Sequence, residues 1–154
     1  MAKTKKNKTT KMNPDDLIYE LRGGNHVKCK VSNDAATYQV IIVDIWNHKV
    51  MLSGVRQGEW HSIKKIKPLK LSKEWFDKQV KAKPNSRYYI YDDVDNECYT
   101  IGMPNGLFMT IDKDGYGLRI GQTTEFSHEL IKLQYVHELQ NIYIDINKES
   151  LQLI

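Results

Sequence analysis

Apolar and polar residues alternate through the first half of the chain, with the two-residue period of half-buried β-strands. Segments of this kind, rich in β-branched and aromatic residues, cover residues 27–31, 38–46, 49–53 and 59–66. The pairs Asn33–Asp34 and Asn47–His48 have turn-forming side chains and separate successive segments. Four short, tightly turned strands predict a small SH3-like or open β-barrel.

Two short helices are predicted to flank these strands. Asn13 is a favourable N-cap and Pro14 suits the first helical position, so a helix is expected from Pro14 to about Leu21. Ser72 caps a second helix, whose apolar face is formed by Trp75, Phe76 and Val80. Either Trp60 or Trp75 is expected to be a buried aromatic residue of the barrel.

The second half of the chain predicts an antiparallel meander covered by a C-terminal helix. Its strands are expected over residues 87–91, 97–102, 107–112, 116–120 and about 130–134. Asn105–Gly106 and Asp114–Gly115 are typical of hairpin turns. The polar segment 81–86 separates this half from the barrel. We therefore expect an α+β protein with a disordered basic tail (1–12), a barrel lobe with flanking helices (13–80) and a sheet with a C-terminal helix (87–154).

The expected C-terminal helix, from Tyr135, has one apolar and one polar face. Its apolar stripe includes Leu139, so Leu139→Asp should unfold the second lobe, whereas His137→Ala should matter much less. His137 and Asn141 are four residues apart and therefore neighbours on the polar face. A helix that hydrogen-bonds the end of a sheet through these residues explains them better than catalysis does.

The residues that could support catalysis or bind a metal lack the necessary spacing. The five histidines form no H-x-x-x-H or H-x-H pair and occupy positions His26, His48, His61, His128 and His137. Cys29 and Cys98 lack a C-x-x-C partner and are expected to be buried thiols. We therefore expect no enzyme activity, no catalytic residues, no metal and no cofactor.

No apolar run approaches the roughly 18–20 residues that span a bilayer, and the lysine-rich start lacks the apolar segment of a signal peptide. The cytoplasm is therefore the expected location, with no membrane partner. The net charge of +4 hides an uneven distribution. Lysines gather in the first eleven residues and again over residues 64–83, whereas residues 92–97 form an acidic turn. Two basic clusters are typical of a protein that binds a phosphate backbone, and also of a merely solubilising surface.

The candidate nucleic-acid-binding residues are aromatic side chains of the barrel together with lysines. Trp46, Trp60 and His61, with Tyr38, could stack on unpaired bases. Phosphates would be contacted by Lys64, Lys65 and Lys67 and by the tail lysines Lys3, Lys5, Lys6, Lys8 and Lys11. In the alternative hypothesis, the sheet and helix form a docking surface for a protein. A basic groove lined by exposed rings would favour nucleic acid, and a flat apolar patch would favour a protein.

Four segments carry a resemblance to a known group of proteins. They are Leu21–Val27 (LRGGNHV), Trp60–His61, Ile66–Trp75 (IKPLKLSKEW) and Tyr135–Tyr143 (YVHELQNIY). In this order they resemble a family of small proteins, without assigned activity, from gut Bacteroidetes and their phages and mobile elements. The similarity covers Leu21 to the end. The chain differs by its lysine tail, by the helix from Pro14, and by residues 144–149 (IDINKE), where such proteins continue with a glycine-containing turn.

The resemblance implies a phage or prophage setting and supplies no catalytic residues. Together with the residue patterns, it predicts a non-enzymatic binding module of a phage or mobile element, associated with nucleic acid and located in the host cytoplasm. The alternative is a virion-associated structural protein or a protein-interaction protein, whose partner is a phage or host protein.

Overall fold

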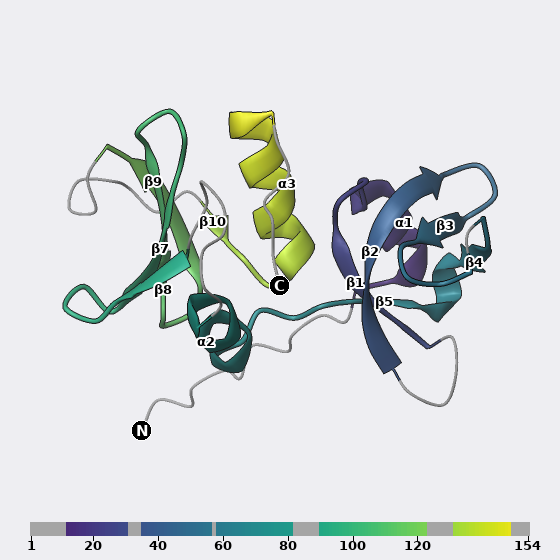
Figure 1. The fold of residues 1–154 in the computed structure, drawn as a ribbon, viewed down its shortest axis with the longest axis horizontal. Helices are drawn as coiled ribbons and strands as arrows, with labels where there is room; N and C mark the ends of the chain where they lie inside the picture. The colour runs from purple at the N-terminus through teal and green to yellow at the C-terminus, as the bar shows by residue number, and fades with distance from the viewer. Residues whose placement is uncertain (1–11, 31–34, 57, 82–89, 123–130, 149–154) are drawn as a thin grey trace, which may run out of the picture.

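The computed structural model describes residues 12–30, 35–56, 58–81, 90–122 and 131–148. It shows two lobes, each built around a five-stranded antiparallel sheet, with helices packed beside and between them (Figure 1). The predicted α+β class is therefore confirmed. Several predicted features lie outside the described residues: the tail over 1–11, the turn at Asn33–Asp34, residues 82–86 of the polar joint, residues 87–89 of the first predicted strand of the meander, and His128.

The first lobe contains α1 (Pro14–Glu20), β1 (His26–Lys30), β2 (Ala35–Asp44), β3 (Lys49–Leu52), β4 (Trp60–Ser62), the 3-10 turn η1 (Ile63–Lys65) and β5 (Ile66–Pro68). The sheet order is β4-β3-β2-β1-β5. The long strand β2 pairs with β1 and with β3, and a register shift between Val40 and Ile42 lets it bend between these two partners. Since β4 and β5 are the two edges, the described strands form an open sheet, and we keep the name barrel lobe for this part of the chain.

The segment expected as one strand over residues 59–66 is in fact broken by η1. Ile63 and Ile66 are both buried, and residues three apart on a strand point to opposite faces. A 3-10 turn has three residues per turn and therefore returns Ile66 to the same side as Ile63. The side chain of Ser62 accepts a hydrogen bond from the backbone N–H of Lys64 at 3.4 Å and caps this turn. The chain then leaves β3 behind and pairs β5 with β1.

The second lobe contains α2 (Lys73–Lys81), β6 (Ile90–Asp93), β7 (Cys98–Gly102), β8 (Phe108–Asp112), β9 (Gly117–Gly121), β10 (Ile131–Lys132) and α3 (Val136–Asn147). The order β10-β9-β8-β7-β6 is the predicted meander. Gly106, with φ +79°, and Gly115, with φ +77°, adopt the left-handed conformation that the two predicted hairpin turns require.

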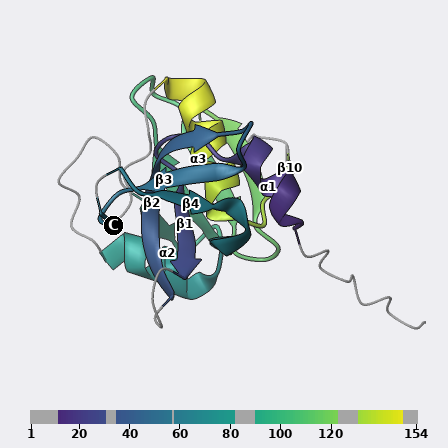
Figure 2. The ribbon, with the colours of Figure 1, turned by 90° about the vertical axis from the view of Figure 1, so that its right-hand side faces the viewer.

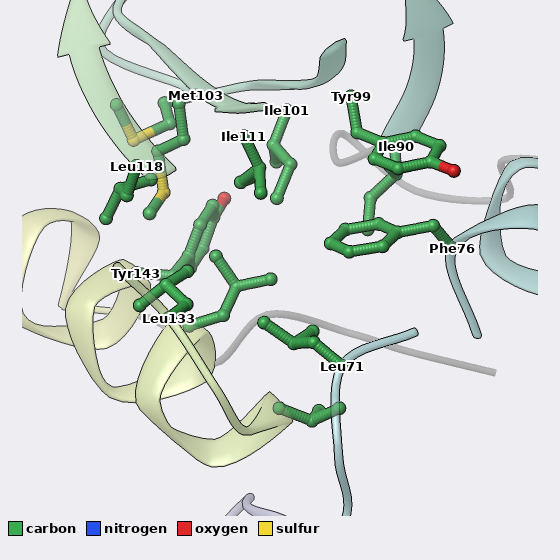
Figure 3. Close-up of a cluster of buried hydrophobic side chains, with 13 residues drawn as sticks. Leu71, Phe76, Ile90, Tyr99, Ile101, Met103, Ile111, Leu118, Leu133 and Tyr143 are labelled. Atoms are coloured by element: carbon green, nitrogen blue, oxygen red, sulfur yellow. The ribbon is translucent and has the colours of Figure 1, made fainter. Parts of the chain in front are cut away.

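The helix α2 packs on the second sheet and not on the barrel. The sequence predicts it as part of the barrel lobe over residues 13–80. Phe76 is fully buried, and its ring stacks on that of Tyr99 with 4.1 Å between centroids (Figure 3). Leu71, just before α2, lies in the same cluster. The core of the second lobe therefore begins about ten residues before the boundary expected at residue 80. An amphipathic helix between two sheets can cover either, and the sequence does not indicate which.

The expectation that Trp60 or Trp75 fills the core of the barrel is wrong. Trp75 lies edge-on against Phe76 at the border of the second core, and Trp60 is 40% exposed on β4. The barrel core is aliphatic instead, and it includes Leu17, Ile18, Val27, Val40, Val50, Leu52, Ile63 and Ile66. The helix α1 supplies two of these residues and begins, as predicted, at the cap Asn13.

Candidate functional site

The polar face of α3 is buried against the connection between α1 and β1, so the helix joins the two lobes (Figure 1). The Gln140 amide donates hydrogen bonds to the carbonyl of Gly24 at 3.1 Å and to Nδ1 of His26 at 2.9 Å. Its oxygen accepts a hydrogen bond from the backbone N–H of His26 at 2.8 Å. Asn141 donates to the carbonyl of Glu20 at 2.7 Å and accepts from the side chain of Asn25 at 3.0 Å.

Two further side-chain contacts flank these hydrogen bonds. Nε2 of His137 lies 3.0 Å from Oε2 of Glu20, and the His137 side chain is fully buried. Arg22 reaches Asp145 near the end of α3 at 2.6 Å. His137 and Asn141 thus have the structural role expected for them, but their partner is the first lobe and not the end of the second sheet. Two of the segments that carry the family resemblance, Leu21–Val27 and Tyr135–Tyr143, contact each other here.

His26 makes this lobe contact sensitive to pH. Because a Gln amide nitrogen can only donate, Nδ1 of His26 must accept, and the ring must be unprotonated at that atom. Burial lowers the pKa of His26 from 6.5, and the nearby charge of Lys78 lowers it further. The unfolded chain therefore takes up this proton first as the pH falls. The contribution of His26 to stability is complete above about pH 7 and decreases below pH 6.5.

We expect His26→Gln to reduce the pH dependence of stability. In the native protein, the free energy of unfolding should fall between pH 7.5 and pH 5.5, because protonation of His26 favours the unfolded chain. The variant lacks this group and should lose less over the same interval. Denaturant titrations at both pH values measure the difference. A loss as large in His26→Gln as in the native protein would show that another group causes the dependence.

The outer face of the barrel carries most of the strongly exposed large apolar residues among those described. Ile42, Met51 and Trp60 lie side by side across β2, β3 and β4, as the strand register shows. The exposed apolar residues of this face and of the adjoining β2–β3 turn form a surface that we call the apolar face. It consists of Ile41, Ile42, Ile45, Trp46 and Trp60. These strands lie at the front of Figure 2, with α3 and the second lobe behind them.

Trp46 is at the tip of the β2–β3 hairpin and is 94% exposed. The turn beneath it is well defined, because Asp44 accepts hydrogen bonds from the backbone and side chain of Asn47 at 3.1 and 2.8 Å. These bonds also hold the pKa of Asp44 below its usual value. His48 completes the turn with φ +51°. An indole ring is therefore displayed on a fixed hairpin with its surface open to a partner.

His61 does not belong to this surface, contrary to the grouping of Trp60 with His61. Neighbouring residues on a strand point to opposite faces, so with Trp60 outside His61 points inward. It is 4% exposed, and its Nε2 has no hydrogen-bond partner among the described residues. A buried side chain in this position cannot stack on a base.

Replacing His61 by Leu should leave the free energy of unfolding unchanged or raise it, because an unsatisfied buried polar atom costs about 1–3 kcal/mol. Denaturant unfolding measures the change. As a control, Val50→Ala at the directly opposed position on β3 should be destabilising, since it removes buried methyl groups. A marked destabilisation by His61→Leu would reveal a polar partner of the imidazole.

A second surface feature is a groove of about 480 Å³ where α1, β5 and the start of α3 meet. We call it the lysine groove, and it is lined by Met12, Asn13, Pro14, Leu17, Lys64, Ile66, Lys67, Pro68, Lys70 and Tyr135. Of the three candidate lysines in this part of the chain, Lys64 and Lys67 line the groove and Lys65 is exposed outside its lining. The five tail lysines lie outside the described residues. Exposed rings are absent from the lining, since Tyr135 is only 5% exposed.

The charges of the two halves have opposite signs. Residues 1–71 contain fourteen Lys and Arg against six Asp and Glu, whereas residues 72–154 contain nine against thirteen. The acidic turn after β6 is partly neutralised, because Asp92 pairs with Lys113. Asp93 in turn accepts hydrogen bonds from Asn96. An anionic partner should therefore be attracted to the barrel half of the protein.

The described residues contain no cluster of three or more His, Cys, Asp or Glu that could hold a metal ion. Cys29 and Cys98 are buried free thiols, and burial raises the pKa of both. Within the ranges that the structure describes, no helix is long and apolar enough to cross a membrane.

Comparison with known proteins identifies no similar protein. The chain matches no known family model, no curated protein and no solved structure. The function must therefore be argued from the apolar face, the lysine groove and the charge distribution.

Proposed function

We propose that the chain is a non-enzymatic binding module of a phage or mobile element, and that its barrel lobe binds single-stranded nucleic acid. The exposure of Trp46 on a hairpin turn closed by Asp44–Asn47 hydrogen bonds is the observation that supports this most directly. Trp60 is exposed on β4 of the same sheet, and both residues belong to the basic half of the chain. Indole rings stack on bases of any sequence, and lysines attract the phosphates between them.

Replacing Trp46 by Ala should weaken binding to an oligothymidylate by about 10- to 100-fold, since stacking contributes about 1–3 kcal/mol per base. The melting temperature should not change, because the indole makes little contact with the rest of the protein. Tyr19→Ala is the matched control, as Tyr19 is an exposed aromatic residue on α1, 66% accessible. Fluorescence titration measures both affinities. Equal affinities for the two variants would remove Trp46 from the interface.

Binding should also weaken with salt, by about 0.7 log units per neutralised phosphate for each log unit of salt concentration. Deleting residues 1–12 removes the five tail lysines. The number of neutralised phosphates that the slope reports should therefore fall by up to about five. Lys64→Glu with Lys65→Glu should weaken what remains. Undetectable binding at low salt to both single and double strands would exclude the nucleic-acid function.

A protein-interaction or virion-associated function is the second candidate, and the aliphatic part of the apolar face favours it. Ile41, Ile42 and Ile45 are each about half exposed and offer nothing to a charged backbone. Exposed apolar patches of this kind mark protein interfaces. If nucleic-acid binding is absent, the chain should be sought in purified phage particles. Loss of its incorporation in an Ile42→Glu variant, with incorporation retained in Ile131→Glu, would support this candidate.

A further inference from the structure

The lysine groove has the size and the lining of a small-molecule site. Its volume of about 480 Å³ lies within the roughly 300–1,000 Å³ that is usual for ligand pockets. The lining is mainly apolar, with Leu17 and Ile66 from the barrel and Tyr135 from the second lobe. Two proline rings, Pro14 and Pro68, add flat apolar surface.

The far wall of the groove is held by backbone pairing between the lobes. Lys70 and Tyr135 form an isolated antiparallel bridge. On either side of it, Leu71 N–H donates to the Gln134 carbonyl at 3.0 Å, and Val136 N–H donates to the Leu69 carbonyl at 2.8 Å. The position of Tyr135 relative to the barrel lysines is therefore set before any ligand arrives, which reduces the entropy lost on binding.

The charge of the groove is positive and uncompensated. Its polar lining includes the exposed lysines Lys64, Lys67 and Lys70 and no carboxylate, and none of the three makes an ion pair within the described residues. Lys67 also lies directly opposite Lys28 in the β1–β5 ladder. Like charges in opposed positions repel, and an anion between them would relieve the repulsion.

We infer that the lysine groove binds a small phosphate ester with a flat apolar body, of the nucleoside monophosphate class. The lysines meet the phosphate, because ammonium groups bind phosphate as point charges without a fixed geometry. The flat body of the ligand rests on the two prolines, Pro14 and Pro68. This site is separate from the apolar face, but it shares Lys64 and Lys67 with the proposed single-strand surface. Trp46→Ala distinguishes the two, because Trp46 lies outside the groove.

The test is a calorimetric and NMR titration of the full chain with thymidine 5′-monophosphate, thymidine and inorganic phosphate. The nucleotide should bind at least tenfold more tightly than either of the other two, and it should shift the amide signals of Ile66, Lys67 and Lys70. Thymidine binding as tightly as the nucleotide would overturn the role of the lysines. Phosphate binding as tightly would overturn the role of the apolar lining.

The triple variant Lys64→Gln, Lys67→Gln, Lys70→Gln should lose at least tenfold in nucleotide affinity. Its control is Lys30→Gln, Lys49→Gln, Arg56→Gln, which changes the net charge equally on the same lobe outside the groove and should stay within twofold. Thermal melting establishes that both triple variants are folded, as expected for exposed side chains. Trp46→Ala should leave nucleotide binding unchanged. Equal losses in the two triple variants, or a loss in Trp46→Ala, would place the nucleotide elsewhere and overturn the inference.

Discussion

Leu139→Asp should unfold the second lobe. Leu139 is completely buried between α3 and the second sheet, in the cluster drawn in Figure 3. An aspartate there would lose the apolar contacts of the leucine and bury an unpaired charge, at a combined cost of more than about 4 kcal/mol. That is comparable with the whole stability of many small domains. Loss of the dispersed methyl signals of Ile101 and Ile111 in NMR spectra would report the unfolding.

Ile144→Asp on the same helix is the matched control, because Ile144 is only partly buried and lies outside the core cluster. It introduces the same charge on the same helix, with a somewhat smaller loss of helix propensity because Ile is a weaker helix former than Leu. We expect a clearly smaller effect from it. If the two variants had the same melting temperature, the apolar stripe of α3 would not be what holds the helix on the sheet.

Gln140→Ala should weaken the contact between the two lobes without unfolding either sheet. The variant loses three hydrogen bonds and leaves the N–H and Nδ1 of His26 without their partner, while the carbonyl of Gly24 keeps the hydrogen bond from the Gln39 amide at 3.3 Å. Each unsatisfied buried group costs about 1–3 kcal/mol, so a total on the order of 2–4 kcal/mol is expected after partial rehydration. Hydrogen exchange should show faster exchange at the α1–β1 connection and at the first turns of α3.

Two controls test whether this effect comes from the lost hydrogen bonds. Gln134 is exposed just before α3, and its side chain makes no hydrogen bond among the described residues. Gln134→Ala should therefore leave the stability and the hydrogen exchange unchanged. Gln140→Glu keeps the acceptor for the His26 N–H but cannot donate a hydrogen bond while it is ionised. Its stability should therefore be lower than that of the native protein, and it can lie above or below that of Gln140→Ala. Unchanged exchange in Gln140→Ala would mean that the other lobe contacts, those of Asn141, Arg22 and the Lys70–Tyr135 bridge, are sufficient without Gln140.

The full burial of His137 changes the expectation for this residue. A solvent-facing histidine could be replaced by alanine at little cost, but His137 is fully buried and lies against Glu20. Its position makes it part of the same lobe contact as Gln140 and Asn141. The chemistry of the YVHELQNIY segment is therefore explained by hydrogen bonding between lobes, and it leaves the apolar face and the lysine groove as the surfaces available to a partner.

Local sequence signals determined the elements of this protein. The hairpin turns around Gly106 and Gly115, the cap at Asn13 and the start of α3 all lie where the sequence predicts them. Such signals act over a few residues, because a turn needs a particular φ and a helix end needs a particular acceptor. The meander was predictable for the same reason, since short hairpins pair neighbours in sequence.

Only the tertiary structure decided which surfaces those elements share. The sequence pattern of α2 shows an apolar face but does not say that Phe76 packs on Tyr99 of the second lobe. The contact of Gln140 with His26 joins residues 114 apart, which no local period can indicate. The lysine groove likewise forms only because a backbone bridge brings Tyr135 beside Lys70. The period of the apolar residues indicates which side of each helix or strand is buried. The element that packs against that side depends on which apolar faces fit together once all the helices and strands are present.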